Sequence, residues 1–304
     1  MAKSKHPSVF VVTPIFNRKE HTLAFLKTLF ENDYPNFTMV IVDDGSTDGS
    51  SEAIKAKFPK TTILKGTGSL YWTGCTNLGV DYALKHGADY IITVNNDVEL
   101  RSSWISELVE CAQKNPKALV GSLIYFMNDR KRVWYFGADF NYETGELYHK
   151  EDEPKSKRPI ESKWLTGMGV LIPAGAFKDV GHYDIEKFPQ YFADADFSLR
   201  AAKKGYKLLV TPKAVLYNDS KSDSGGKLMA QYKLRAVPKL LFTPYFSDSI
   251  KVRKEFYRRY FGEDYKKIYR HYYRHRWAQF YGPYVRHCVR LKLVRIAKWL
   301  GVKK

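Results

Sequence analysis

Polar side chains follow three apolar runs in the first third of the chain, at points where buried strands would end. The residues at these points are Thr13 and Pro14 after "SVFVV", Asp43 and Asp44 after "FTMVIV", and Asn95, Asn96 and Asp97 after "YIITV". A carboxylate at a strand end can accept the imide N–H of uracil or thymine, and oxygen ligands are those that Mg²⁺ prefers. The structural alternatives are a helix N-cap at Ser46 or Asp48 and an Asx turn at residues 95–97.

The elements that must position these residues alternate between strand and helix. Apolar runs predict strands at 8–14, 37–46, 61–66 and 90–97, and helical patterns fill 19–32, 75–87 and 102–115. This alternation, with strands that are apolar throughout, predicts a parallel sheet covered by helices on both faces. Ligands of such sheets bind at the carboxyl ends of the strands. The three polar segments are therefore expected to share one edge.

The chain changes character after this first part. The segment "RVWYFGADFNYETGELYHK" predicts a hairpin with its turn at "ETGE". The segment "DADFSLRAAKKGYKLLVTP" predicts a helix with acidic residues in its first turn, a stop at Gly205 and a further strand. The polar stretch "NDSKSDSGGK" indicates a domain edge. We therefore predict a first domain over residues 1–225 and a second region over 226–304.

Four segments in order resemble the family 2 glycosyltransferases of the GT-A fold. They are "VVTPIFNR" with "VIVDDGSTD", then "YIITVNNDVEL", "TGMGVLIPAGAFKDVGHYD" and "YFADADFSLRAAKKGY". The resemblance covers residues 8–220 and implies an α/β fold with a Rossmann-like, mostly parallel central sheet and helices on both faces. The loop "GTGSLYWTGCTNLGVDYAL" is also similar to a subgroup that contains rhamnosyltransferases.

This resemblance implies transfer of a sugar from a nucleotide sugar, in which Mg²⁺ or Mn²⁺ neutralises the departing diphosphate. Asp97 is the expected metal carboxylate. Asn95 stands where the family has its first aspartate, facing ribose or metal-bound water. Asn218 stands where many relatives have a metal-binding histidine. We therefore expect weaker metal binding than in those relatives, with Asp97 and the diphosphate providing most of the ligands.

The family's Glu-Asp-x-Asp segment aligns with "FADADFSLR" and implies that Asp194 is the base that takes the proton of the acceptor hydroxyl. Asp196 would hold the helix start or the acceptor, and Ala193 replaces the family's usual glutamate. The alternative for both aspartates is a favourable interaction with the helix dipole. Arg200 lies four residues after Asp196, where a helical ion pair is expected.

The resemblance places further residues around the two substrates. On the donor side it implies Thr13, Pro14, Asn17, Asp44, Ser46, Trp72, Asn77, Asn95 and Asn96. On the acceptor side it implies Trp164, Thr166, Gly167 and Asp196. Trp72 would pack either on a base or sugar or within the core. Ordinary strand positions remain the alternative for the first three acceptor-side residues.

The composition bounds the class of protein. The chain has 304 residues of which 44% are hydrophobic, enough to bury a full core. Three cysteines without metal-ligand spacing favour a reduced, cytoplasmic compartment. The sequence contains no apolar run of roughly 18 residues, which a membrane span requires. We read the short basic and apolar start as a first strand and not as a signal peptide.

The positive charge is concentrated at the end of the chain. Residues 251–304 contain 17 Lys and Arg against 3 Asp and Glu, a net charge of +14 out of +18. Apolar residues recur at helical spacing among arginines near the end, and these are Val285, Val289, Leu293, Ile296 and Leu300 with Arg286, Arg290 and Arg295. Packing on the catalytic domain, binding to an anionic membrane surface and binding to nucleic acid are the alternatives. We favour the membrane, because basic side chains are attracted to anionic lipid, Trp and Tyr favour the interface, and a lipid-linked acceptor would lie there. The segment contains no recognised nucleic-acid motif.

The sequence as a whole predicts an inverting, metal-dependent glycosyltransferase of polysaccharide biosynthesis for cell wall, capsule or lipopolysaccharide. It would move a hexose or deoxyhexose, with rhamnose included, from a UDP- or dTDP-sugar to a hydroxyl of a glycan or lipid-linked glycan. It would lie peripherally on the cytoplasmic face of the membrane. The main alternative is a non-catalytic nucleic-acid-binding or membrane-adaptor protein on a degenerate transferase scaffold. A nucleotidyltransferase is disfavoured, because the N-terminus lacks a glycine-rich basic phosphate loop.

Overall fold

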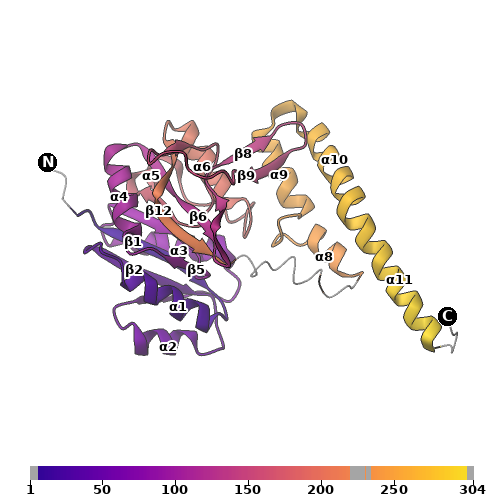
Figure 1. Ribbon diagram of the computed structural model, residues 1–304, viewed down its shortest axis with the longest axis horizontal. Coiled ribbons are helices and arrows are strands. Elements are labelled where there is room, and N and C mark those ends of the chain that lie inside the picture. Colours follow the sequence, from indigo (N-terminus) through magenta and orange to yellow (C-terminus); the bar gives the residue numbers. More distant parts are fainter. Residues whose placement is uncertain (1–5, 220–229, 231–233, 300–304) are drawn as a thin grey trace. The chain divides into compact units, whose positions relative to one another are not determined.

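The structure is a computed structural model that describes residues 6–219, 230 and 234–299 (Figure 1). It divides into two compact units, one of residues 1–139 and 147–222 and the other of residues 140–146 and 223–304. The domain boundary expected after residue 225 lies outside the described residues.

The centre of the first unit is a parallel sheet, which confirms the predicted α/β class. Its strands are β1 (Val9–Ile15), β2 (Phe37–Asp43), β3 (Thr62–Lys65) and β4 (Tyr90–Thr93), in the order β3-β2-β1-β4. Ile15 pairs with Asp43 and Val12 with Thr93, so these strands end at one edge of the sheet. Residues 9–13 of β1 are all buried. Because their side chains alternate between faces, both faces of the sheet are covered.

Antiparallel strands extend this sheet beyond β4. The strand β11 (Val170–Pro173) lies antiparallel between β4 and β6 (Ala118–Phe126), and β12 (Lys207–Asn218) runs parallel to β6. Shorter strands pair at the margins, namely β5 (Val98–Leu100) and β10 (Ile160–Glu161) with β12, and β7 (Asp129–Tyr135) with β6. The pairing of β5 with the end of β12 brings the segment after Asp97 beside Asn218.

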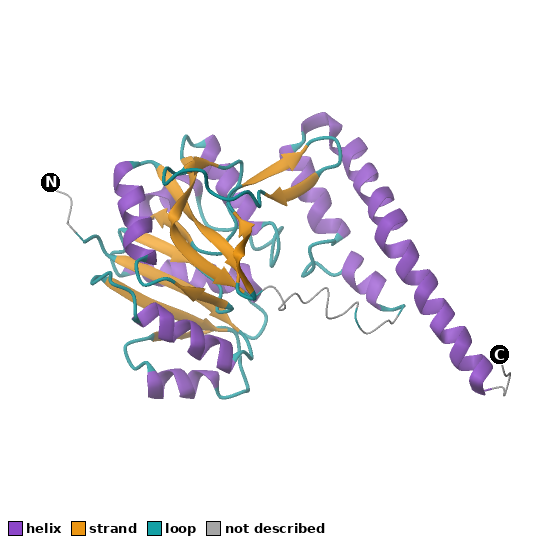
Figure 2. Cartoon of the chain, in the orientation of Figure 1, coloured by secondary structure: helices purple, strands orange, loops and turns teal. Residues whose placement is uncertain are grey.

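Helices connect and cover these strands (Figure 2). They are α1 (Lys19–Phe30), α2 (Ser50–Lys57), α3 (Tyr71–Lys85), α4 (Trp104–Lys114), α5 (Ala174–Val180) and α6 (Ala193–Lys203). Gly79 lets α3 approach the sheet closely, because a Cβ at this position would lie 2.3 Å from Cγ1 of Val12. This packing fixes the start of α3, which carries Trp72, over the carboxyl ends of the strands.

The predicted hairpin is present as β8 (Ala138–Asn141) and β9 (Glu146–His149), which form a two-stranded sheet. The second unit is otherwise helical. Its elements are α8 (Ala236–Phe242), α9 (Ile250–Tyr260), the 3₁₀ turn η2 (Gly262–Asp264), α10 (Tyr265–Arg276), the π-helical turn η3 (Trp277–Tyr281) and α11 (Gly282–Trp299). A small apolar core joins α8 to Tyr281. Among the described residues, no helix combines the length and apolarity needed to cross a membrane.

Candidate active site

The ends of β1 and β2 are tied together by Asn17 and Ser46. The Asn17 N–H donates to the Ser46 hydroxyl at 2.9 Å, and the Thr47 N–H donates to the Asn17 side-chain oxygen at 2.7 Å. Asn17 has a φ of 50°, a left-handed conformation that asparagine tolerates better than most residues. These two predicted donor-side residues therefore lie together and shape the sheet edge.

Asp44 organises the loop before α3. Its two carboxylate oxygens accept the N–H groups of Gly68, at 2.8 Å, and Tyr71, at 3.0 Å. A Cβ at Gly66 would lie 2.5 Å from one of these oxygens, so only glycine fits there without displacement. Asp44 is therefore a loop anchor, while its remaining lone pairs can still accept a bond from a base.

Asp97 lies at the same edge and is paired with Arg18. The Arg18 guanidinium donates to Oδ2 of Asp97 at 2.7 Å, and 11% of the Asp97 side chain is exposed. The other carboxylate oxygen, Oδ1, is buried and has no hydrogen-bond partner in the described part of the chain. A buried oxygen with unused lone pairs is costly, so Oδ1 is suited to an external partner.

The backbone of Asn218 lies close to the segment that carries Asp97. Asn218 pairs with Val98 across β12 and β5, and the Asp219 N–H donates to the Asp97 carbonyl at 3.0 Å. Within residues 6–219, 230 and 234–299, no three His, Cys, Asp or Glu side chains form a group that could hold a metal ion. One carboxylate with an unused oxygen and a neighbouring amide fit Mg²⁺ or Mn²⁺ whose other ligands come from substrate and water.

Trp72 connects this region to Asp194. The indole N–H donates to the side-chain oxygen of Asn95 at 3.0 Å, and the Trp72 backbone N–H donates to the side-chain oxygen of Gln190 at 2.9 Å. A Cβ at Gly167 would lie 2.5 Å from the indole ring and 3.3 Å from Cβ of Asp194. Trp72 is thus half-buried at this edge and packs against Gly167, which also contacts Asp194.

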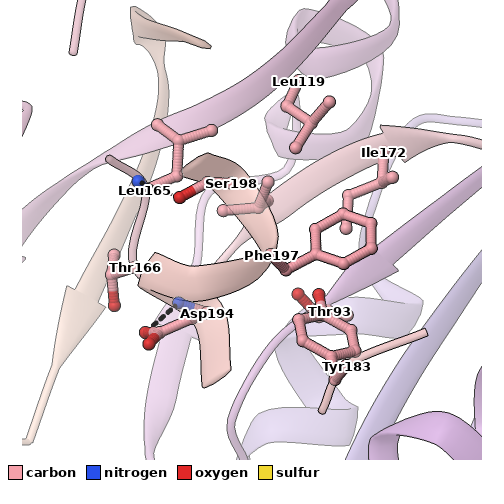
Figure 3. A pocket seen from close by; sticks show the side chains of 11 residues that line it. Thr93, Leu119, Leu165, Thr166, Ile172, Tyr183, Asp194, Phe197 and Ser198 are labelled. Carbon is pink, nitrogen blue, oxygen red and sulfur yellow. Dashed lines mark hydrogen bonds between the residues drawn. The ribbon is translucent and has the colours of Figure 1, made fainter. Parts of the chain in front are cut away.

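Asp194 lies in the first turn of α6 (Figure 3). Its carboxylate accepts the Gly167 N–H at 2.8 Å and the Ala195 N–H at 2.9 Å. Burial raises the pKa of the Asp194 carboxyl above its usual range, and the backbone N–H groups of Gly167, Ala195 and Asp194 itself oppose that shift only in part. A carboxylate with a raised pKa is a stronger base than an ordinary surface aspartate.

A small cavity adjoins Asp194, with a volume of about 10 Å³. Thr166, Gly167, Ser198, Phe197 and Tyr183 are among the residues that line it (Figure 3). Its volume is close to the minimum that one water molecule requires. The cavity is therefore too small for a sugar.

Comparison with known proteins identifies the family. The sequence pattern of glycosyl transferase family 2 matches residues 10–179, more than half of the chain. The chain belongs to glycosyl transferase family 2. It is 25% identical over 251 residues to N-acetylglucosaminyl-diphospho-decaprenol L-rhamnosyltransferase of Mycobacterium tuberculosis, covering 73% of this chain and 81% of the relative. It is 26% identical over 136 residues to dTDP-rhamnosyl transferase RfbF of Shigella flexneri, covering 45% and 44%.

A solved structure has a similar fold. The crystal structure of GalNAc-T7 with UDP, GalNAc and Mn²⁺ superposes with a TM-score of 0.61 at 14% identity, covering 88% of this chain and 55% of that chain. The GT-A fold implied by the sequence is thereby confirmed. Family membership, relatives and fold together support a glycosyltransferase.

Three other predicted residues of this family 2 member form hydrogen bonds within the protein. Asn96 is buried and donates to Thr22, and Asn77 exchanges two hydrogen bonds with the backbone of Tyr183. Asp196 is fully buried and accepts from Arg200 at 2.8 Å, which is the expected helical ion pair. Asn96 and Asp196 are therefore buried, whereas Asn77 is half-buried.

The remaining predicted positions also lie in packed surroundings. Thr13 is fully buried, Pro14 is half-buried in β1, and Trp164 is buried and donates to the Asp139 carbonyl at 3.2 Å. Thr166 lines the small cavity near Asp194. Trp164 and Thr166 come from the segment before β11, so their backbone positions Gly167.

Sequence reasoning missed two residues of this site. Arg18 lies in the quoted segment "VVTPIFNR", and its place directly after a strand was a usable signal, because a cation there falls at the same edge as Asp97. Gln190, which holds Trp72, comes from an irregular loop without any comparable pattern.

Residues with a left-handed backbone conformation also lie at or near these predicted site residues. The non-glycine residues with positive φ in the described part of the chain are Asn17, Tyr71 and Phe192. Each is a predicted site residue or lies within two residues of Trp72 or Asp194. Such conformations cost free energy and persist where surrounding contacts enforce them.

Gly167→Ala is expected to lower activity sharply and stability moderately. The added Cβ would overlap the Trp72 ring and press on Asp194, and overpacking of this kind costs about 1–3 kcal/mol. Thermal unfolding and transfer rate measure the two effects. Gly175→Ala is the control, because a Cβ there meets no atom within 4 Å. Full activity of Gly167→Ala would contradict the close packing of Trp72 and Asp194.

Proposed function

We propose that the protein is an inverting, metal-dependent glycosyltransferase that uses a UDP- or dTDP-sugar. The observation that carries the proposal is Asp194, a carboxylate of raised pKa held by Gly167 beside Trp72. The donor sugar is a hexose or deoxyhexose, and the names of two relatives favour rhamnose. The acceptor is a hydroxyl of a glycan or lipid-linked glycan, which the decaprenol-linked acceptor in one relative's name supports.

In this proposal the acceptor oxygen attacks the anomeric carbon in a single displacement. The new C–O bond forms as the bond from carbon to the diphosphate oxygen breaks, and the diphosphate leaves with the electron pair. Asp194 takes the proton of the attacking hydroxyl. Asn95 and Gly167 keep Trp72 and Asp194 in place.

Asp97 and Asn218 are the residues that would hold the divalent ion. The unused buried oxygen of Asp97 supports this assignment, and Asn218 pairs with Val98, the residue that follows Asp97. A bound Mg²⁺ or Mn²⁺ supplies charge neutralisation at the diphosphate.

The test is transfer from UDP- and dTDP-sugars to a polyprenyl-diphosphate-linked sugar, with the product's anomeric configuration read by NMR. We expect the configuration to be inverted relative to the donor. A retained configuration would overturn the single displacement. Absence of transfer, combined with salt-dependent binding to RNA or single-stranded DNA, would favour the non-catalytic alternative.

The pH dependence follows from the raised pKa of Asp194. The base must be ionised, so kcat/KM should fall as the pH drops through that raised pKa. The acid limb should therefore lie above the usual aspartate range near 4. A rate that stays constant from pH 7 down to about pH 4 would contradict the role of Asp194. Circular dichroism over the same range controls for unfolding.

We further propose that α11 attaches the protein to the cytoplasmic face of an anionic membrane. Val285 packs on the small core of the second unit, whereas Val289, Leu293 and Val294 are exposed. Arg286, Arg290, Lys292 and Arg295 are exposed on the same helix. Exposed apolar side chains among basic ones are typical of helices that lie in the membrane interface. Ile296 and Leu300 of the predicted stripe lie outside the side chains that the structure describes.

Reversing two charges tests this attachment. Arg286→Glu with Arg290→Glu should lower binding to phosphatidylglycerol vesicles by tenfold or more, because each basic side chain near anionic lipid contributes roughly 1 kcal/mol. Co-sedimentation measures the binding. Lys55→Glu with Lys57→Glu on α2 removes the same charge from exposed positions and is the control. An equal loss of vesicle binding in both double variants would show that binding depends on net charge alone. It would refute a membrane-binding surface on α11.

A further inference from the structure

Arg18 is a cation at the expected diphosphate position that the reaction described above leaves without a role. It lies between β1 and α1, and its guanidinium contacts Oδ2 of Asp97 at 2.7 Å. Its side chain is 27% exposed and that of Asp97 is 11% exposed. The pair is thus partly accessible from solvent, and the guanidinium has N–H donors beyond the one used on Asp97.

The charges at this edge of the sheet decide how a donor diphosphate interacts with the Arg18–Asp97 pair. Asn95 and Asn218 are neutral, and Asp219 lies 3.8 Å from His21. The carboxylate of Asp97 would repel a donor diphosphate unless a cation lies between them. Arg18 is already at that carboxylate, and the planar guanidinium is suited to bidentate contact with phosphate.

Asp97 has one oxygen bound and one unused. Oδ2 accepts from Arg18, while buried Oδ1 has no hydrogen-bond partner in the described part of the chain. A divalent cation that binds Asp97 while Arg18 remains paired with it is repelled by the positive charge of the guanidinium. The divalent ion and Arg18 therefore compete for the same carboxylate.

We propose that Arg18 is a donor-binding residue that exchanges partners. It pairs with Asp97 before the nucleotide binds and moves to the donor diphosphate when the nucleotide binds, which frees Asp97 for the divalent ion. This inference rests on the proposed function. It makes the ion and the nucleotide bind cooperatively, and linkage requires that each raises the affinity for the other by the same factor.

Two affinities of Arg18→Ala should change in opposite directions. Affinity for UDP or dTDP without metal, measured by calorimetry, should fall roughly tenfold or more, because a charge-assisted hydrogen bond to phosphate is lost. Affinity for Mn²⁺ without nucleotide, measured by electron paramagnetic resonance, should rise, because the competing cation is gone. The cooperativity between Mn²⁺ and nucleotide should shrink accordingly. A residue that only stabilises the fold would lower both affinities together.

A second variant and a control keep this test decisive. Arg18→Gln keeps a hydrogen-bond donor toward Asp97 but loses the charge, and should give the same two changes if Arg18→Ala fails to fold. Lys114→Ala removes an exposed cation from its ion pair with Glu110 and should change neither affinity. Unchanged nucleotide affinity, or a fall in both affinities, in the folded variants would overturn the role of Arg18 alone. A wild-type protein that binds neither UDP nor dTDP with Mn²⁺ would overturn the proposed function as well.

Discussion

Asp194→Asn is expected to lower the rate of sugar transfer by about 10²–10⁴-fold, the usual contribution of a general base. The amide cannot accept the acceptor's proton at neutral pH. Asp194 lies in the first turn of α6, next to the Gly167 N–H, and is not among the expected metal ligands. Donor affinity should therefore stay within a few-fold of the wild-type value. Steady-state kinetics and calorimetry separate the two quantities.

The fold must survive this substitution for the result to be informative. The asparagine side chain has one acceptor oxygen, whereas the aspartate accepts from both Gly167 and Ala195. A modest loss of thermal stability is therefore expected and is measured on the same samples. Asp129→Asn, on an exposed position of β7, is the control and should leave kcat unchanged. Near-normal turnover of folded Asp194→Asn would show that Asp194 is not the base that takes the acceptor's proton.

Asp248→Ala should destabilise the second unit by about 3–5 kcal/mol. Its carboxylate accepts from the hydroxyls of Tyr272 and Tyr281 and from Arg276, and it lies 3.5 Å from Arg253. Arg253 is 7% exposed, so the substitution would leave a buried cation without this carboxylate. Hydrogen exchange of α9 and α10 measures the loss within this unit.

The pH dependence of this network has a definite sign. Burial opposes ionisation of Asp248, but Arg253, Tyr281 and Arg276 outweigh it and hold the pKa below its usual range. A depressed pKa stabilises the folded state above the ordinary aspartate pKa, and this contribution is lost as the pH falls through the depressed value. The difference in unfolding free energy between wild type and Asp248→Ala should thus shrink in acid. Glu263→Ala, on an exposed position, should change stability by less than about 0.5 kcal/mol. Equal stability of Asp248→Ala and Glu263→Ala would contradict the account of this network.

The sequence predicted those parts of the site that follow from local pattern. Continuous apolar runs indicated β1, β2 and β4, and parallel pairing explains why Asp97 lies at the same edge as Asn17. The neighbourhood of Asp97 and Asn218 followed from family resemblance and not from pattern. The antiparallel insertion of β11 did not follow from local pattern, because it depends on pairing between strands far apart in the chain.

Side-chain partners were harder to predict than positions. Asp44 was expected to face a base, yet both of its oxygens accept loop N–H groups. Asp196 was expected at the helix start or the acceptor, and it is buried against Arg200. Carboxylates at strand ends and helix starts can serve either the backbone or a ligand, and only the surrounding geometry distinguishes the two uses.

The most direct test of the central claim is metal-dependent binding of a nucleotide sugar. Thermal unfolding is measured with a panel of UDP- and dTDP-sugars, with and without Mg²⁺ or Mn²⁺, for the wild type and Asp97→Ala. A ligand that binds the folded state raises the unfolding temperature by mass action. We predict that at least one donor stabilises the wild type only when metal is present, and that Asp97→Ala loses this response. Failure of every donor to stabilise the wild type in the presence of metal would contradict the account.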